Sequence, residues 1–268
     1  MKPNSERKHK QGFCLQIIIS LLLTMSLLAA CSDINPTINP TPAKTMIAAV
    51  TPTPPVEIQA NPTAAANGSV NYSFPEMIEP GARYLFYLHG KIIEDQGVPV
   101  VSPEFGAYEF DETLRYFATA GFNVIAEVRS ANTNVDEYSD KVISQINTLL
   151  QQGVPSENIT VVGFSKGGWI ATLTSAKLRN PGVNFVLIAI CGEEINATSG
   201  ISLSGRVLSL YEASDEFGST CKPLVERSPG VTGFDEIEFN TGLRHGAFYA
   251  ADSTWLDPLI SWLLEEGS

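Results

Sequence analysis

Short apolar runs alternate with amphipathic stretches from about residue 70 to the C-terminus. Runs rich in β-branched and aromatic residues predict strands, which lie at 83–89, 122–128, 159–164, 184–190, 206–211 and 235–239. These runs are almost uniformly apolar instead of alternating with polar residues. Such a pattern is typical of strands that are covered on both faces of a parallel sheet.

Helical periodicity occupies several of the segments between these strands. Helices are predicted at 111–120, 136–152 and 166–179, and a last helix begins at Asp257 as N-cap with Pro258 as its first residue. The alternation of strands and helices predicts an α/β fold, with a doubly wound, mostly parallel sheet and helices on both faces.

The first 67 residues show neither the apolar runs of strands nor the periodicity of helices. Basic residues precede an apolar run at 17–30, which is shorter than the ~20 residues of a membrane-spanning helix and typical of a secretory signal peptide. The run ends in Leu28-Ala29-Ala30-Cys31, which resembles the bacterial lipobox. The resemblance implies removal of residues 1–30, a diacylglyceryl anchor with fatty chains such as palmitate on Cys31, and export to the extracytoplasmic face of a bacterial membrane. A plain signal anchor, or a small-residue cleavage site with an incidental cysteine, is the alternative.

Prolines dominate the segment that follows. Seven of the 17 prolines lie between residues 32 and 67, with Thr, Asn and Ala among them and little charge. Because X-Pro steps keep the backbone extended and cannot build a helix or a ladder, residues 31–67 are predicted to be a lipidated cysteine and a flexible stalk. A disordered segment without a spacing role differs little from this in physical terms. The folded domain is expected at 68–268.

Composition narrows the class of protein. The chain has 268 residues, of which 44% are hydrophobic, enough for one domain with a buried core and its appendages. Its 17 basic and 29 acidic residues give a net charge of −12, which argues against a nucleic-acid-binding protein. With two histidines left after the signal peptide and no clustered ligands, neither a metal nor a cofactor is expected.

The strongest chemical signal is Gly163-Phe164-Ser165-Lys166-Gly167, a G-x-S-x-G pattern. Chance produces this pattern about once in ten chains of this length, so its position between a predicted strand and a predicted helix matters more than the letters. A nucleophile elbow occupies that junction, because the turn exposes the serine hydroxyl above the sheet beside a helix N-terminus. A glycine-rich turn with a capping serine is the alternative.

A serine nucleophile needs a base, and the chain has only three histidines. His9 lies in the predicted signal peptide, and His89 ends the first strong strand at a predicted tight turn. His245 follows the strand that ends near Phe239, so it is expected at the carboxyl edge of the sheet, where ligands bind in open α/β folds. His245 is therefore the candidate base.

The base in turn needs a carboxylate that fixes its orientation. Asp215 follows the strand 206–211 at an offset that allows the chain to turn back toward His245, and it is the best candidate. Four other carboxylates in the two neighbouring loops are alternatives: Glu212, Glu216, Glu193 and Glu194.

The elbow and the chain order Ser165, Asp215, His245 resemble the α/β-hydrolase superfamily over roughly residues 80–268. The resemblance implies that Ser165 is the nucleophile, that His245 is the general base and then acid, and that Asp215 orients it. Only residues 191–214 separate the preceding strand from Asp215, which leaves no room for a large lid. A small, nearly cap-free hydrolase is therefore favoured over a long-chain lipase.

The same resemblance implies an oxyanion hole made of two backbone amides. One is the amide after the nucleophile, that of Lys166. The other follows an early strand, where His89-Gly90 resembles the family's His-Gly turn and makes Lys91 the second donor. The sequence continues with Ile92 instead of the glycine run of many lipases.

Two cysteines, Cys191 and Cys221, remain after Cys14 is removed and Cys31 is acylated. An even pair in an exported chain suggests a disulfide. It would close a loop that contains Asp215 and stabilise the fold by about 3–4 kcal/mol in the chain-entropy model. Two free thiols are the alternative.

These features predict a serine hydrolase that cleaves an ester-like bond of a small-molecule or acylated substrate through an acyl-enzyme. A peptidase or thioesterase of the same superfamily, and a non-catalytic lipid-anchored binding protein on the same scaffold, are the alternatives. Four aromatic residues flank the motifs and belong either to the core or to an acyl pocket: Trp169, Phe164, Phe248 and Tyr249.

Overall fold

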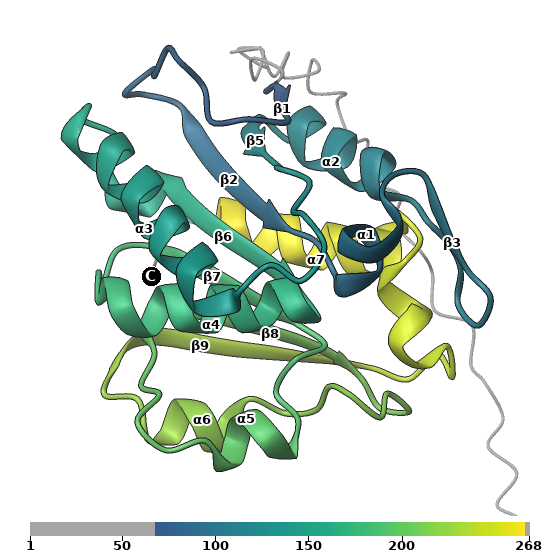
Figure 1. The fold of residues 1–268 in the computed structure, drawn as a ribbon. Helices are drawn as coiled ribbons and strands as arrows, with labels where there is room; N and C mark the ends of the chain where they lie inside the picture. Colours follow the sequence, from purple (N-terminus) through teal and green to yellow (C-terminus); the bar gives the residue numbers. More distant parts are fainter. Residues whose placement is uncertain (1–67, 266–268) are drawn as a thin grey trace, which may run out of the picture. The chain divides into compact units, whose positions relative to one another are not determined.

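A seven-stranded parallel sheet forms the centre of residues 68–265, the part of the chain that this computed structural model describes. The strand order is β1-β5-β2-β6-β7-β8-β9, and every neighbouring pair is parallel (Figure 1). The strands are β1 (Val70–Asn71), β2 (Arg83–Leu88), β5 (Phe122–Ile125), β6 (Ile159–Phe164), β7 (Asn184–Ile188), β8 (Ser204–Glu212) and β9 (Gly230–Phe239). The predicted signal peptide, Cys31 and stalk lie outside the described residues.

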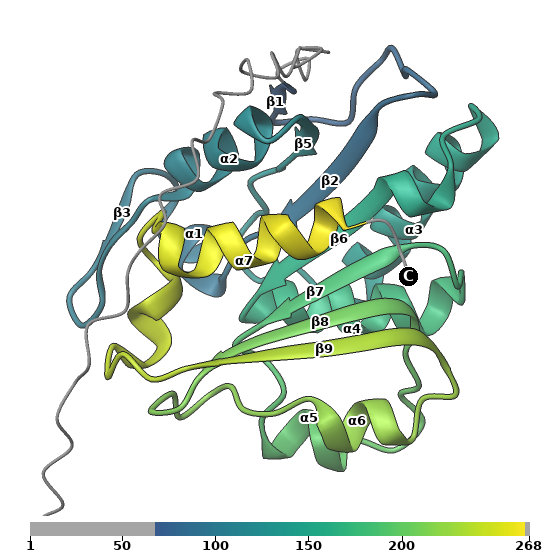
Figure 2. The same cartoon turned by 180° about the vertical axis from the view of Figure 1, so that it is seen from behind.

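Helices cover both faces of this sheet, which confirms the predicted α/β class (Figures 1 and 2). One face packs against α2 (Phe110–Thr119) and α7 (Ser253–Leu264). The other packs against α3 (Val135–Gln151), α4 (Lys166–Leu178), α5 (Glu193–Ala197) and α6 (Lys222–Glu226). A short helix α1 (Lys91–Gln96) and an antiparallel hairpin of β3 (Val100–Ser102) and β4 (Gly106–Tyr108) follow β2.

Burial on two faces explains the uniformly apolar strands. In β2, Leu85 and Tyr87 point into the core under α2 and α7, whereas Tyr84 and Phe86 point into the core under α3 and α4. All four are almost completely buried. Because successive side chains of a strand face opposite ways, a strand between two helical layers has no position that favours a polar residue.

Helix α7 begins five residues earlier than the sequence predicts. Asp252, not Asp257, is the N-cap, and its carboxylate accepts a hydrogen bond of 2.7 Å from the amide of Thr254. Pro258 therefore lies inside the helix, where it has no N–H to donate to the preceding turn. Burial of Trp255 in the first turn supports the longer helix despite that missing bond.

Other departures concern short elements. Strand β9 is about twice as long as predicted, because this edge strand continues through polar positions, with an exposed residue at every third position and half-buried residues between them. Helix α1 and the β3–β4 hairpin were not predicted, since six and three residues are too few to establish a period. None of the helices in residues 68–265 is long and apolar enough to cross a lipid bilayer.

The strand order reverses at β2 and β6. From β2 the chain proceeds to β5 on one side, and from β6 it proceeds to β7 on the other side. The connections that leave the carboxyl ends of these adjacent strands therefore diverge, which creates a crevice at a topological switch point. Ser165 follows β6 directly, and Gly90 and Lys91 follow β2.

Candidate active site

Ser165 occupies a strained turn between β6 and α4. Its backbone has φ 53° and ψ −120°, a conformation that non-glycine residues rarely adopt. The amide of Ser165 donates a 3.0 Å hydrogen bond to the carbonyl of Ile188 in the neighbouring strand β7, and its carbonyl accepts from Trp169 in the first turn of α4. The turn is thus held from both sides with its side chain partly exposed.

Two glycines of the motif permit this turn by their lack of a side chain. A Cβ on Gly163 would lie 2.3 Å from the carbonyl oxygen of Gly167, and a Cβ on Gly167 would lie 1.8 Å from the carbonyl oxygen of Leu88. Backbone therefore meets backbone where β2, β6 and α4 converge. Any larger residue would force these elements apart.

His245 and Asp215 are brought together from two different loops. His245 Nδ1 lies 2.8 Å from Asp215 Oδ2, the Asp215 side chain is fully buried and the His245 side chain is 9% exposed. The amide of Phe217 donates to Asp215 Oδ1 at 3.0 Å. Because an ionised carboxylate only accepts hydrogen bonds, Nδ1 carries the proton and Nε2 is left as an acceptor.

Ser165 and His245 line one cavity of about 200 Å³. Its other lining residues are Gly90, Lys91, Ile92, Phe164, Phe217 and Tyr249. Within the described part of the chain, no hydrogen bond joins the Ser165 hydroxyl to the imidazole. Such bonds are often long in unliganded enzymes and tighten when a substrate binds.

Aromatic rings restrict the orientation of the imidazole. The rings of Phe164, Phe217 and Phe105 have their centroids 4.8, 5.1 and 6.1 Å from that of His245. Of the aromatic residues named from the sequence, Phe164 and Tyr249 line the small cavity, whereas Phe248 packs in the core.

Ser165 also lines a larger cavity of about 620 Å³. Trp169, Ile190 and Ile195 form apolar parts of its wall, and Glu193 and Glu194 also line it. Phe217 lines both cavities and is 61% exposed, so the two spaces share this residue as well as Ser165.

The alternative carboxylates occupy other places. Glu193 and Glu194 belong to the large cavity, and Glu216 forms an ion pair with Arg244, which also pairs with Glu104. Glu212 accepts hydrogen bonds from backbone amides of two loops, those of Ser214 in one loop and of Thr241 and Gly242 in the other. Of the five candidates, Asp215 is the one that contacts His245.

His89 is held in a purely structural environment. The ring is completely buried, Nδ1 donates to the carbonyl of Gly90 at 2.8 Å, and Nε2 accepts from the amide of Arg129 at 2.9 Å. Burial and, secondarily, the Arg129 charge lower the pKa of His89 to about 3. The ring is therefore neutral, and both nitrogens are already engaged.

A buried ion network underlies the candidate oxyanion donors. Glu94 in α1 pairs with Arg129 at 2.7 Å, with both side chains fully buried, and with Lys166 at 2.5 Å. The Lys166 ammonium also donates to the carbonyl of Thr133 at 2.8 Å, and Arg129 donates to the carbonyl of His89. Lys166 is thus anchored, not a solvated helix-start lysine.

This network links the two chain segments whose amides were predicted as oxyanion donors. Glu94 lies one turn after Lys91 in α1, and its carboxylate forms an ion pair with the side chain of Lys166. Sequence reasoning missed Glu94 and Arg129. The only local signal was a glutamate directly after two apolar residues, in Ile92-Ile93-Glu94, and polar residues follow it.

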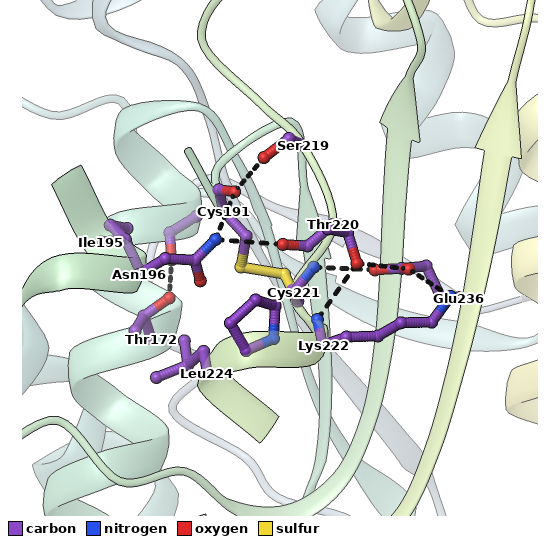
Figure 3. The surroundings of a disulfide bond; sticks show 12 residues. Thr172, Cys191, Ile195, Asn196, Ser219, Thr220, Cys221, Lys222, Leu224 and Glu236 are labelled. Carbon is purple, nitrogen blue, oxygen red and sulfur yellow. Dashed lines mark hydrogen bonds and ion pairs between the residues drawn. A yellow bond between two sulfur atoms is a disulfide. The ribbon is translucent and has the colours of Figure 1, made fainter. Parts of the chain in front are cut away.

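Cys191 and Cys221 are joined by a disulfide in the structure (Figure 3). Both residues are buried, and the carbonyl of Cys191 accepts hydrogen bonds from Ser219 Oγ at 2.6 Å and from Asn196 Nδ2 at 3.2 Å. The amide of Cys221 donates to Glu236 in β9 at 2.8 Å. The bond ties the segment after β7 to the end of the loop that carries Asp215.

Histidine, cysteine, aspartate and glutamate are the side chains of residues 68–265 that could ligate a metal ion. No group of three or more His, Cys, Asp or Glu side chains in that range is arranged to hold a metal ion. The chemistry available at this site is that of a serine hydroxyl, an imidazole paired with a carboxylate, and backbone amides at a helix N-terminus.

No protein-family model matches this sequence, and no curated protein matches it. Solved structures do resemble it. A Klebsiella pneumoniae protein assigned as a dienelactone hydrolase has a TM-score of 0.50 at 14% identity, over 72% of this chain and 90% of that chain. Arabidopsis thaliana SOBER1 has a TM-score of 0.47 at 13% identity, over 68% and 97%. An esterase domain from Rhodothermus marinus has 0.46 at 12%, over 71% and 89%.

The first of these similarities spans most of both chains, and it agrees with the parallel sheet and its two helical layers. The parallel sheet with helices on both faces is the architecture that the sequence resemblance implied. This chain therefore has the α/β-hydrolase fold.

Proposed function

We propose that the protein is a serine hydrolase that cleaves an ester-like bond. The observation that carries the proposal is the shared cavity, where a serine on a strained elbow faces an imidazole hydrogen-bonded to a buried carboxylate. A strained backbone at an exposed hydroxyl costs about 1–3 kcal/mol and is typical of functional sites.

In the proposed reaction, Ser165 Oγ attacks the substrate carbonyl carbon while His245 Nε2 takes its proton. Asp215 stabilises the resulting imidazolium through the bond at Nδ1. The amides of Lys166 and Lys91 bind the oxyanion of the tetrahedral intermediate. His245 then protonates the leaving group, and water, deprotonated by the same imidazole, hydrolyses the acyl-enzyme and regenerates the hydroxyl.

The two cavities suggest where the parts of the substrate bind. The leaving group must reach Nε2 of His245, so it belongs in the cavity of about 200 Å³ that this side chain lines. The acyl group then extends into the cavity of about 620 Å³ that Ser165 also lines. That volume is within the range of small-molecule sites. Short to medium acyl esters are therefore the proposed substrates.

The proposed location is the extracytoplasmic side of a bacterial membrane, with a lipid anchor at Cys31. Support comes from the basic, apolar and lipobox-like order of residues 2–31. The disulfide between Cys191 and Cys221 fits an oxidising compartment, because such bonds are rare in cytosolic proteins.

A fluorophosphonate probe tests the nucleophile directly. The wild-type chain should become labelled and should hydrolyse p-nitrophenyl esters, whereas Ser165→Ala should do neither. His245→Asn should label far more slowly, because the hydroxyl then has no base. A wild type that labels no more than Ser165→Ala would favour a non-catalytic binding protein. A panel of esters from acetyl to long acyl chains would define the acyl pocket.

A further inference from the structure

Glu212, the last residue of β8, is a completely buried carboxylate with an unusual set of partners. Its Oε2 accepts from the amide of Ser214 at 2.7 Å and from the Ser214 hydroxyl. Its Oε1 accepts from the amides of Thr241 at 2.7 Å and Gly242 at 3.0 Å. Among the described residues, no lysine, arginine or histidine forms an ion pair with it.

The two oxygens serve two different loops. Ser214 immediately precedes Asp215, whereas Thr241 and Gly242 begin the loop that leads to His245. The adjacent strands β8 and β9 end side by side at Glu212 and Phe239, so one carboxylate sits where both loops depart. Further bonds run from the Asp215 amide to the Glu212 carbonyl at 2.9 Å and from the Ala213 amide to the Phe239 carbonyl at 2.8 Å.

The partners require an ion at this position. All five partner groups donate, namely the amides of Ser214, Thr241 and Gly242 and the hydroxyls of Ser214 and Thr241. Only a carboxylate presents two oxygens that accept on both sides. A glutamine would turn an NH₂ group toward one of the two loops, where it would meet N–H donors. Burial by itself raises the pKa of Glu212, but the bonds from Ser214, Gly242 and Thr241 outweigh it and lower the pKa below its ordinary value.

We propose that Glu212 is a positioning residue that holds the Asp215 loop and the His245 loop at the separation that their hydrogen bond requires. The inference rests on the proposed hydrolase function. Glu212 lines neither cavity beside Ser165, so it acts on the proton relay and not on substrate binding.

The test compares Glu212→Gln with wild type in ester hydrolysis and in the low-field proton NMR signal of the His245 Nδ1–H that faces Asp215. The kcat of Glu212→Gln should fall roughly 10- to 100-fold, the scale of a small misplacement of catalytic groups. KM should change little, because the cavities keep their walls. The low-field signal should shift or disappear.

Asp235→Asn is the control for the loss of a negative charge from this pair of strands, at an exposed position. Asp235 lies in β9, where its carboxylate accepts a 2.8 Å hydrogen bond from Trp262 Nε1, remote from both loops. The change removes the same charge from the same pair of strands, and it should leave kcat and the NMR signal as in wild type. Ser214→Ala covers the case in which Glu212→Gln does not fold. It removes one of the bonds to Glu212 and should shift the signal in the same direction, with a smaller loss of kcat.

The proposal is overturned if folded Glu212→Gln keeps the wild-type kcat and NMR signal. It is also overturned if Asp235→Asn loses as much kcat as Glu212→Gln at an equal folded fraction. When Glu212→Gln does not fold, an unchanged signal in Ser214→Ala overturns it. Failure of the proposed function is a separate result, because the wild type would then show no Ser165-dependent labelling while the NMR signal could still report on Glu212.

Discussion

Two buried glutamates, Glu94 and Glu212, support different parts of the candidate site. Glu94 contacts the segment that follows Ser165, and Glu212 contacts the loops that carry Asp215 and His245. Glu94 lies beside the proposed oxyanion donors, where the cations of Arg129 and Lys166 balance its charge. Glu212 lies on the acid–base side, where its charge is balanced by backbone amides and a hydroxyl. The same side chain, equally hidden from water, is thus stabilised in two physically different ways.

The difference determines what each carboxylate controls. A buried ion pair neutralises charge, but burial also removes water from the cations. Removal of the carboxylate therefore leaves the cations buried and unpaired. Backbone amides carry only partial charges that are fixed in direction, so a carboxylate bound to them dictates the path of the chain. Glu94 is therefore expected to govern mainly stability, and Glu212 the geometry of the loops.

The largest effect is expected on the oxyanion side. Glu94→Gln leaves Arg129 and Lys166 with no opposite charge in a buried site, and it should lower the free energy of unfolding by about 3–5 kcal/mol. Urea denaturation of the oxidised protein measures this. The control is Asp95→Asn on the same helix, where the partner Lys91 is exposed and the cost should be at most about 1 kcal/mol. Equal losses in the two variants would remove the distinction between buried and exposed pairs.

The next effect concerns the covalent link on the acid–base side. Replacing both Cys191 and Cys221 by serine should lower the free energy of unfolding by about 3–4 kcal/mol, because the disulfide spans 30 positions. Since the closed loop carries Asp215, ester hydrolysis should fall as well. Reduced wild type should behave like the double variant in both measurements. Peptide mass mapping that finds two free thiols in the native protein would contradict this prediction.

The smallest effect is a pH dependence that sharpens the comparison. The folded protein lowers the pKa of Glu212 from its ordinary value of 4.5, so the ion contributes stability above that value and loses it as the pH falls through the lowered pKa. The difference in unfolding free energy between wild type and Glu212→Gln should be constant near neutral pH and shrink below about pH 4.5. Urea denaturation at several pH values measures it. A difference that grows on acidification would contradict the assignment of an ionised, amide-bound carboxylate.

The sequence predicted some parts of the site better than others. Ser165 could be predicted as the nucleophile because the G-x-S-x-G motif coincides with the change from a strand pattern to a helix pattern at residues 159–166. His245 could be predicted as the base because the other two histidines, His9 and His89, could be set aside. Asp215 was the best candidate for the carboxylate, but four alternatives stayed open, since the offset from a strand end does not reveal which way a loop turns. The prediction of where α7 begins was wrong, because Asp257-Pro258 has the local pattern of a helix start whereas the helix begins after Asp252.

By itself the amino-acid sequence determined the alternation of strands and helices, the α/β class and the elbow at Ser165. These depend on the spacing of apolar residues and on short-range backbone sterics, which neighbouring residues specify. Only the tertiary structure decided which carboxylate meets His245, and what surrounds Glu94 and Glu212. Those contacts join residues about 30 positions apart, such as Glu94 with Arg129 and Glu212 with Thr241. They form only because the parallel sheet brings the carboxyl ends of separate strands to one edge, and no local pattern encodes that convergence.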